Sequence, residues 1–395
     1  MRGRSDLLTP LLAGCVTALV GFAGAFPVVL AGLRGAGASA DQAASGLLAV
    51  SVGAGVAAIL MSRRLRMPVA MAWSTPGAAL LVSTGAPDGG FRASVGAFLV
   101  CGGLIVLSGL WRTLGRAIAA IPPALASAML AGVLLPICLA PARAVVEIPW
   151  VAAPVVLTWA VLTRVSRTWA ATGAIAAAVV AVAIDGPGDL SGVSWLPTLT
   201  TVSPAFEPAA IVGIGLPLFI VTMASQNIAG MGVLASFGYR PPLAPILTTT
   251  GAATMVVAPF GGHAVNLASI SGALAANPDV HPDPERRWIA SATAGAALIA
   301  LGLCAGVATA LVAASPALLV EAVAGLALLF PLAGALTAAI ADAERRDAAV
   351  VTLVVSASGV TAAGISASFW GLVAGLAFLG LGRLRRGAQT GARSG

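Results

Sequence analysis

The sequence predicts an all-α polytopic membrane protein with 14 transmembrane segments, arranged as a seven-plus-seven inverted repeat. Three observations predict this class: an apolar composition, apolar runs along nearly the whole chain, and arginines placed at the ends of those runs. Of the 395 residues, 59% are hydrophobic and 9% are charged, whereas a soluble domain has about 25% charged residues. We therefore expect no sizeable soluble domain.

Apolar runs recur from Leu7 to Leu384, and a helix needs about 20 apolar residues to cross a bilayer. The first run is too long for the core of a signal peptide and lacks a clear cleavage site, so we expect a retained span. The first seven predicted segments cover residues 7–33, 42–62, 68–86, 91–111, 114–140, 146–163 and 168–184. The second seven cover residues 209–236, 242–258, 259–276, 287–313, 316–341, 347–363 and 365–382.

The basic residues, all of them arginines, orient these spans. If the connections are assigned alternately to two sides, starting from the N-terminus, the N-terminal side contains 18 of the 21 arginines. The other side contains only Arg34, Arg92 and Arg143. Arginine-rich connections face the cytoplasm, so both termini are predicted to be cytoplasmic, in the inner membrane of a bacterium. This placement explains the net charge of +7 better than nucleic-acid binding does.

The longest stretch without a span, residues 185–208, divides the chain into two halves. Residues 1–184 and 209–395 are each predicted to hold seven spans, with the connector on the extracytoplasmic side. An odd number of spans makes the second half enter the membrane from the opposite side. This arrangement is an inverted-topology repeat, which is typical of secondary transporters.

The third span of each half, spans 3 and 10 of the chain, is predicted to be broken. Ser74, Thr75 and Gly77 surround a proline in the first, and Gly262 follows Pro-Phe-Gly in the second. Proline and paired glycine disfavour a continuous helix, and Ser-Thr-Pro is a helix-start signal. We expect an extended stretch and then a half-helix, beginning near Thr75 and near Gly262. The alternative is an ordinary kinked span.

If the topology is right, both half-helices begin near the bilayer midplane. A helix N-terminus offers unpaired backbone N–H groups and the positive end of a dipole. Two such ends facing one pocket would attract an anion. Irregular backbone at this depth is tolerated only where it is buried in protein or lines a cavity, so these breaks predict the binding site.

Polar side chains near these breaks are the candidate substrate ligands. Gln226 and Asn227 lie in an otherwise apolar span, and His263 and Asn266 lie at the second break. Such groups are costly in hydrocarbon unless they are bonded, either to a substrate or to other helices. His263 can gain or lose a proton near neutrality, so it could bind a carboxylate or transfer a coupling proton. A structural, hydrogen-bonded histidine is the alternative.

Three further residues are weaker candidates. Phe22 and Phe26 could contact a ring or simply pack, and Glu321 could be a proton-linked carboxylate or an interfacial one. The four cysteines lack metal-ligand spacing and are read as small buried hydrophobes. Enzyme and nucleotide-binding motifs are missing from the sequence, so no enzyme, no metal and no cofactor is predicted.

Two segments of the sequence resemble a known family. Thr222-Met-Ala-Ser-Gln-Asn-Ile-Ala-Gly-Met231 and Pro259-Phe-Gly-Gly-His-Ala-Val-Asn-Leu-Ala268 look like signature segments of the benzoate–proton symporters, the BenE family. The resemblance covers nearly the whole chain, including the early Gly21-Phe-Ala-Gly-Ala-Phe-Pro27 segment. It implies the fold of nucleobase and anion transporters with seven-plus-seven inverted repeats.

In that fold, spans 1–4 and 8–11 form a core domain and spans 5–7 and 12–14 form a gate domain, with substrate bound between them. Gln226 and His263 then resemble the positions where nucleobase carriers place acidic residues. Their lack of negative charge fits an anionic substrate. The resemblance implies proton-coupled import of benzoate or a similar aromatic carboxylate by alternating access; a nucleobase or inorganic-anion carrier, and a channel or membrane enzyme, are the alternatives. A homodimer is one oligomeric state left open.

Overall fold

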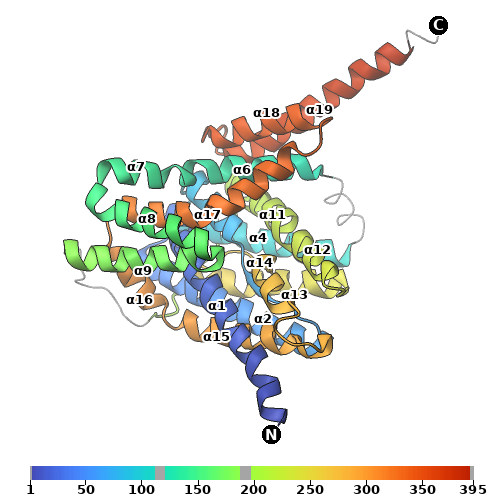
Figure 1. Ribbon diagram of the computed structural model, residues 1–395. Coiled ribbons are helices and arrows are strands. Elements are labelled where there is room, and N and C mark those ends of the chain that lie inside the picture. The colour runs from blue at the N-terminus through green and yellow to red at the C-terminus, as the bar shows by residue number, and fades with distance from the viewer. Residues whose placement is uncertain (1, 112–120, 187–196, 392–395) are drawn as a thin grey trace.

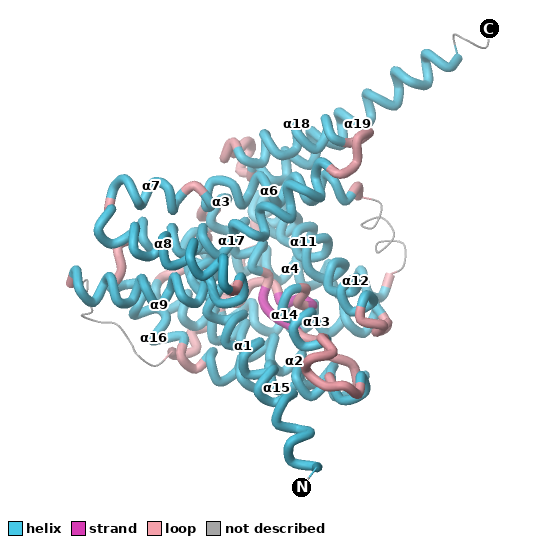
Figure 2. The backbone as a smooth tube through the Cα atoms, viewed as in Figure 1, coloured by secondary structure: helices cyan, strands magenta, loops and turns pink. Residues whose placement is uncertain are grey.

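Helices form nearly all of the computed structural model, which describes residues 2–111, 121–186 and 197–391 (Figure 1). The helices surround one small sheet near the centre of the molecule (Figure 2). The elements of the first half are α1 (Arg2–Gly35), α2 (Ala40–Leu65), β1 (Met71–Trp73), α3 (Thr75–Thr84), α4 (Gly90–Leu110), α6 (Pro123–Cys138), α7 (Ala140–Glu147), α8 (Pro149–Val165) and α9 (Arg167–Asp185).

The second half begins with an interrupted helix and continues through a second broken segment. Its elements are α10 (Pro208–Ala210), η1 (Ile211–Gly215), α11 (Leu216–Thr222), η2 (Met223–Ile228), α12 (Ala229–Ser236), α13 (Leu243–Val257), η3 (Ala258–Phe260), β2 (Val265–Leu267), α14 (Ile270–Ala276), η4 (Pro284–Arg286), α15 (Trp288–Gly302), α16 (Ala305–Ala314), α17 (Ala317–Ile340), α18 (Arg346–Ala357) and α19 (Ala367–Gly391). Two of these, η1 and η2, are π-helical.

Seven of the described helical segments are long and apolar enough to cross a membrane. An eighth candidate is the pair formed by Pro284–Gly302 and α16, which is bent by 54°. Three shorter apolar segments, α8, Trp169–Asp185 and Ala367–Leu381, fall below that length. Most predicted segments end within a few residues of these elements. The exceptions are 347–363, since α18 ends at Ala357, 365–382, since α19 continues to Gly391, and 114–140, whose residues 114–120 lie outside the described part. Many spans are therefore established, and the count of 14 stays a prediction.

The helices of the two halves pack in corresponding pairs. α2 packs on α15, and α13 packs on α4; by the predicted order these are spans 2 with 11 and 9 with 4. Glycine permits close approach in both pairs. A Cβ at Gly55 would lie 2.5 Å from the Gly295 carbonyl oxygen, and one at Gly251 would lie 2.7 Å from that of Gly102. Each pair joins one helix of the first half to one of the second, so the same backbone-to-backbone contact occurs twice between the halves, as an inverted repeat predicts.

The extended stretches of the two broken spans pair with each other. β1 and β2 form an antiparallel sheet in which Ala72 lies opposite Asn266 and Trp73 opposite Val265. Backbone bonds from Ala268 N to Ala70 O, 3.0 Å, and from Ser74 N to the Ala264 carbonyl, 2.9 Å, extend the pairing at both ends. The prediction of an all-α protein therefore needs one refinement. Pairing satisfies the backbone groups of both breaks where no water is available.

The described end of the connector, residues 197–207, packs against α2, α4 and the second broken span. Val202 N donates to the Pro259 carbonyl at 2.7 Å, and Ala205 N donates to that of Arg92 at 2.9 Å. Ser45, in α2, is bonded to both the backbone N–H of Thr200 and the Phe260 carbonyl, each at 2.9 Å. This segment therefore joins α2, α4 and the second break; residues 187–196 of the predicted connector lie outside the described part.

Candidate functional site

The first broken span turns from strand to helix at Ser74, as predicted. Ser74 is fully buried and is the N-cap of α3, where its Oγ accepts the N–H of Gly77 at 3.1 Å. Thr75, the first residue of α3, is half-buried. A Cβ at Gly77 would clash with Leu218 Cδ1, so this glycine allows α3 to approach α11 closely. The N-terminus of α3 thus lies inside the protein, where its dipole is poorly screened.

His263 and Asn266 reach the same turn from the second broken span. Both side chains are fully buried, and His263 Nε2 lies 3.1 Å from the Ser74 carbonyl oxygen. A carbonyl only accepts, so Nε2 is the donor, and the other ring nitrogen is an acceptor in the neutral ring and a donor in the protonated ring. That nitrogen, Nδ1, is buried without a hydrogen-bond partner. In the orientation that satisfies both of its ends, the Asn266 amide oxygen shares the Ser74 N–H with the Ala264 carbonyl, at 2.9 Å, and the amide nitrogen donates to the Leu267 carbonyl at 3.1 Å.

The predicted start of the second half-helix near Gly262 is wrong. Gly261 has a φ of +84° and ends the η3 turn, and the chain then runs extended until α14 begins at Ile270. The physical reason is the pairing of β2 with β1, which uses the backbone groups that a helix would need. Gly262 and His263 therefore lie before the strand and not on a helix, and Asn266 lies within the strand. α14 has only 7 residues, so the anion-attracting end of this site is that of α3.

The polar residues of span 8 lie on the π-helical segment η2. Gln226 is half-buried, and its Oε1 accepts the Ser269 hydroxyl, just before α14, at 3.3 Å. Asn227 is fully buried and holds the second strand, since its Oδ1 accepts the Leu267 N–H at 2.9 Å. π-helical turns are rare and occur frequently at functional sites. Here η2 directs two neighbouring amides to two different points of the second broken span.

Thr222 and Thr254 are buried contacts of the site that the sequence analysis did not select. Thr222 Oγ1 donates to Ser74 Oγ at 3.0 Å, which joins span 8 to the α3 cap. Thr254 of α13 accepts the backbone N–H of Val265 at 2.9 Å. The spacing of the sequence could have indicated Thr222, because it lies four residues before Gln226, about one helical turn, and so on the same helix face. Thr254 has no such signal, since threonine on a long apolar helix is common.

The aromatic candidates form one cluster with a third ring. Phe22 stacks on Phe26 with ring centroids 5.6 Å apart, and Phe22 meets Trp73 edge-on, also at 5.6 Å. All three are buried. Trp73 directly precedes Ser74 along the chain, so the cluster extends from the α3 cap to Phe26. Glu321, in contrast, is exposed on α17.

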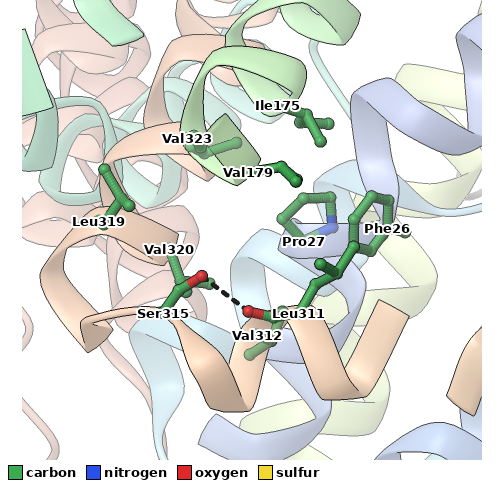
Figure 3. Close-up of a pocket in the computed structure, with 11 residues that line it drawn as sticks. Phe26, Pro27, Ile175, Val179, Leu311, Val312, Ser315, Leu319, Val320 and Val323 are labelled. Atoms are coloured by element: carbon green, nitrogen blue, oxygen red, sulfur yellow. Dashed lines mark hydrogen bonds between the residues drawn. The ribbon is translucent and has the colours of Figure 1, made fainter. Parts of the chain in front are cut away.

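A pocket lies at the far end of this aromatic cluster (Figure 3). It is formed by α1, α9, α16 and α17, and Phe26 and Pro27 form one wall. None of the predicted polar ligands lines it. The polar residues at the α3 cap instead bond to one another and to nearby backbone groups. Phe26 is the one predicted site residue that lines the pocket.

The polar site around the start of α3 contains no buried carboxylate among its described residues. Among the side chains that the structure describes, no Asp or Glu is buried, and the buried polar groups near α3 are hydroxyls, amides and an imidazole. Such a site has donors and a positive helix end but no negative charge. Its chemistry suits a solute that accepts hydrogen bonds and not one that needs an acidic partner.

Apolar spans, two broken segments paired at the centre and a polar site between them define a multi-pass membrane transport protein. The chain belongs to the benzoate membrane transport protein family, BenE, whose model matches residues 6–381. It is therefore a transporter and not an enzyme.

Two relatives match almost the whole chain. The inner membrane protein YdcO of Escherichia coli is 37% identical over 366 residues, which is 92% of this chain and 93% of that protein. The benzoate membrane transport protein of Acinetobacter baylyi is 30% identical over 372 residues, 93% of this chain and 94% of that protein.

Solved structures share the fold at low sequence identity. The transmembrane domain of the cyanobacterial bicarbonate transporter BicA has a TM-score of 0.63 at 15% identity and covers 94% of this chain and 97% of that one. The structure of SLC26A9 has a TM-score of 0.62 at 14% identity, covering 94% of this chain and 64% of that one.

Proposed function

We propose that this protein imports benzoate or a similar aromatic carboxylate together with protons, by alternating access, across the bacterial cytoplasmic membrane. Membership of the benzoate transport family supports the class of substrate, and the relative from Acinetobacter baylyi has benzoate transport in its name. The observation that favours it most in the geometry is the buried, unpartnered Nδ1 of His263, beside the N-terminus of α3.

The carboxylate would bind at the start of α3, where Thr75 and Ser74 offer hydroxyl groups. The helix dipole favours negative charge there, and no buried acid among the described side chains opposes it. His263 would donate to the carboxylate through Nδ1 once the ring is protonated, because Nδ1 of the neutral ring is an acceptor. Gln226 and Asn227 would complete the polar shell, the first by its half-buried amide and the second by holding β2 in position.

The finer topology is part of the proposal. We place 14 spans in two inverted repeats, with both termini cytoplasmic, a core domain of spans 1–4 and 8–11 and a gate domain of spans 5–7 and 12–14. The repeated pairing of α2 with α15 and of α13 with α4 supports the repeat. A separate buried apolar cluster formed mainly by α7, α8, α9 and α17 supports a distinct gate domain.

Proton coupling is assigned to His263, with the exposed Glu321 as the second candidate. A proton that moves with the carboxylate cancels its charge, which removes most of the cost of bringing an anion into a low-dielectric site. His263 is the titratable group in contact with the α3 cap, and its Nδ1 lacks a partner that would hold its protonation state.

Labelled-benzoate uptake into proteoliposomes under an imposed pH gradient tests the proposal. We expect saturable uptake that follows the gradient and collapses when a protonophore is added. Uptake that is unsaturable or indifferent to the gradient would reject it, and conductance without saturation would indicate a channel.

An inorganic-anion carrier is the second candidate, because the N-terminus of α3 could attract any small anion. Competition separates the two candidates. Sulfate or bicarbonate that displaces benzoate at comparable concentration would favour the inorganic anion, and displacement by uracil would favour a nucleobase.

A further inference from the structure

The pocket between α1, α9, α16 and α17 has a lining unlike that of the α3 cap. Ten of its lining side chains are apolar, and the one polar residue, Ser315, donates its hydroxyl to the Leu311 carbonyl at 2.7 Å. The pocket therefore offers no free donor for a charged group. A carboxylate enclosed here would lose its hydration without compensation, so the lining selects for apolar surface.

One wall of the pocket belongs to the aromatic cluster. The Phe26 ring faces the open space together with Pro27, and Val320 and Leu319 of α17 lie across from them (Figure 3). Behind Phe26, Phe22 and Trp73 follow at 5.6 Å steps and end beside Ser74. An uninterrupted series of rings thus joins the apolar pocket to the start of α3.

We propose that this pocket is an access subsite that binds the aromatic ring of the carboxylate before it reaches the α3 cap, with the carboxylate directed out of the pocket mouth. The inference rests on the proposed function and adds a second site to it. Aromatic rings prefer stacked or edge-on contact with other rings, and Phe26 contributes its ring to the wall of an apolar chamber. Passage would then require the Phe26 side chain to move.

The pocket is open at one side, which favours a solute that enters and leaves it. Val179 lines the pocket although its residue is 40% exposed, so the chamber reaches the protein surface beside α9. The helices on its two sides, α1 and α16 on one and α9 and α17 on the other, belong to different domains in the proposed division. A site at that boundary would change shape in each transport cycle, which suits entry and release better than permanent lipid binding.

Two adjacent valines of α9 provide a matched test. Val179→Trp would fill the pocket mouth, whereas Val180→Trp changes a neighbouring residue, 57% exposed, that does not line it. Val320→Trp fills the chamber from the opposite wall. For benzoate uptake in proteoliposomes, we expect both pocket variants to raise KM roughly tenfold, the range in which an apolar pocket discriminates, and Val180→Trp to match wild type.

Benzamide, which has the ring without the charge, probes the pocket separately from the anion site. We expect it to inhibit benzoate uptake by wild type and by Val180→Trp, and to stabilise both purified proteins in a thermal-shift assay. In Val179→Trp and Val320→Trp both effects should be much weaker.

The outcomes separate the two proposals. If wild type takes up no benzoate but benzamide binding persists and depends on Val179, the subsite stands and the proposed function fails. If both pocket variants match Val180→Trp in KM and benzamide response, the subsite is wrong. If benzoate uptake by the wild type varied with the acyl-chain length of the bilayer and benzamide had no effect on it, the pocket would be assigned to a lipid chain and the inference would be overturned.

Discussion

The hydroxyl of Thr222 donates to Ser74 Oγ at 3.0 Å, across 148 residues of sequence. Both side chains are fully buried. Ser74 caps α3, and Thr222 is the last residue of α11, immediately before the π-helical η2. This bond therefore holds the start of the half-helix against the segment that presents Gln226 and Asn227. We therefore expect a substitution at Thr222 to change the position of α3 at the site.

Replacing Thr222 by valine removes the donor and keeps the shape of the side chain. A typical hydrogen bond contributes about 1 kcal/mol, so we expect benzoate affinity to fall about fivefold. Equilibrium binding to purified protein measures this. Thr337→Val is the matched control, since Thr337 is exposed on α17 and bonds only within its own helix, to the Ala333 carbonyl at 2.9 Å. Equal affinities for the two variants would show that the Thr222 bond does not position α3.

Proton coupling should depend on His263. In His263→Gln, an uncharged side chain replaces the titratable ring, so we expect gradient-driven benzoate uptake to fall at least about tenfold, while benzoate exchange at equal pH on both sides continues. Glu321→Gln is the comparison, and we expect it to keep gradient-driven uptake because Glu321 is exposed on α17 and not among the buried polar groups bonded to Ser74. The assignment would be reversed by loss of coupling in Glu321→Gln alone.

Close helix packing should make Gly102 intolerant of a side chain. A Cβ there would lie 2.8 Å from Met255 Cγ and 2.9 Å from the Gly251 carbonyl oxygen, whereas a Cβ at Gly103 meets nothing within 4 Å. Overpacking of this kind costs about 1–3 kcal/mol, so Gly102→Ala should unfold at lower temperature than wild type in detergent. Gly103→Ala should be neutral or slightly stabilising, as alanine is the better helix former. Similar melting temperatures for both variants would contradict the packing of α4 on α13.

Tyr239 offers a direct test of the connection between α12 and α13. Burial raises the pKa of Tyr239 above its usual value of about 10, although the nearby Arg287 lowers it. Its hydroxyl donates to the Pro284 carbonyl at 2.7 Å. Since the raised pKa belongs to the folded state, the stability it contributes is fully present below pH about 10 and is lost as the pH rises through the folded pKa.

The chain has one tyrosine, so its ionisation can be followed by tyrosinate absorbance without overlap. We expect the titration midpoint in the folded protein to lie above that of the unfolded chain. Tyr239→Phe should abolish the signal and lower thermal stability at neutral pH through loss of the Pro284 bond. A midpoint at or below the unfolded value would show that Tyr239 is not packed as described.

Local signals in the sequence predicted several elements to within a few residues. The predicted spans 42–62, 91–111 and 316–341 correspond to α2 (Ala40–Leu65), α4 (Gly90–Leu110) and α17 (Ala317–Ile340). The start of α3 at Thr75 followed from Ser-Thr-Pro alone, because the cap and the proline act within one turn. In each case the residues that determine the element lie inside or beside it.

The prediction of a half-helix start in the second broken span failed because the residues that determine the structure there lie far away in the sequence. Gly262 and His263 resemble a helix start, but the pairing of β2 with β1 keeps the chain extended as far as Leu267. That pairing joins residues nearly 200 positions apart, and no local pattern encodes it. The same holds for the Thr222 bond to Ser74 and for the ring contact between Phe22 and Trp73.

The sequence by itself determined that this chain crosses the membrane many times and breaks at two equivalent places, because hydrophobicity, proline and arginine act through the bilayer and the local backbone. Only the tertiary structure decided which groups meet at those breaks. Strand pairing placed His263 against the Ser74 carbonyl, and helix packing placed Phe26 at the wall of an apolar pocket. Both depend on contacts between distant segments, which hydrogen-bond satisfaction and close packing select only when the whole chain is folded.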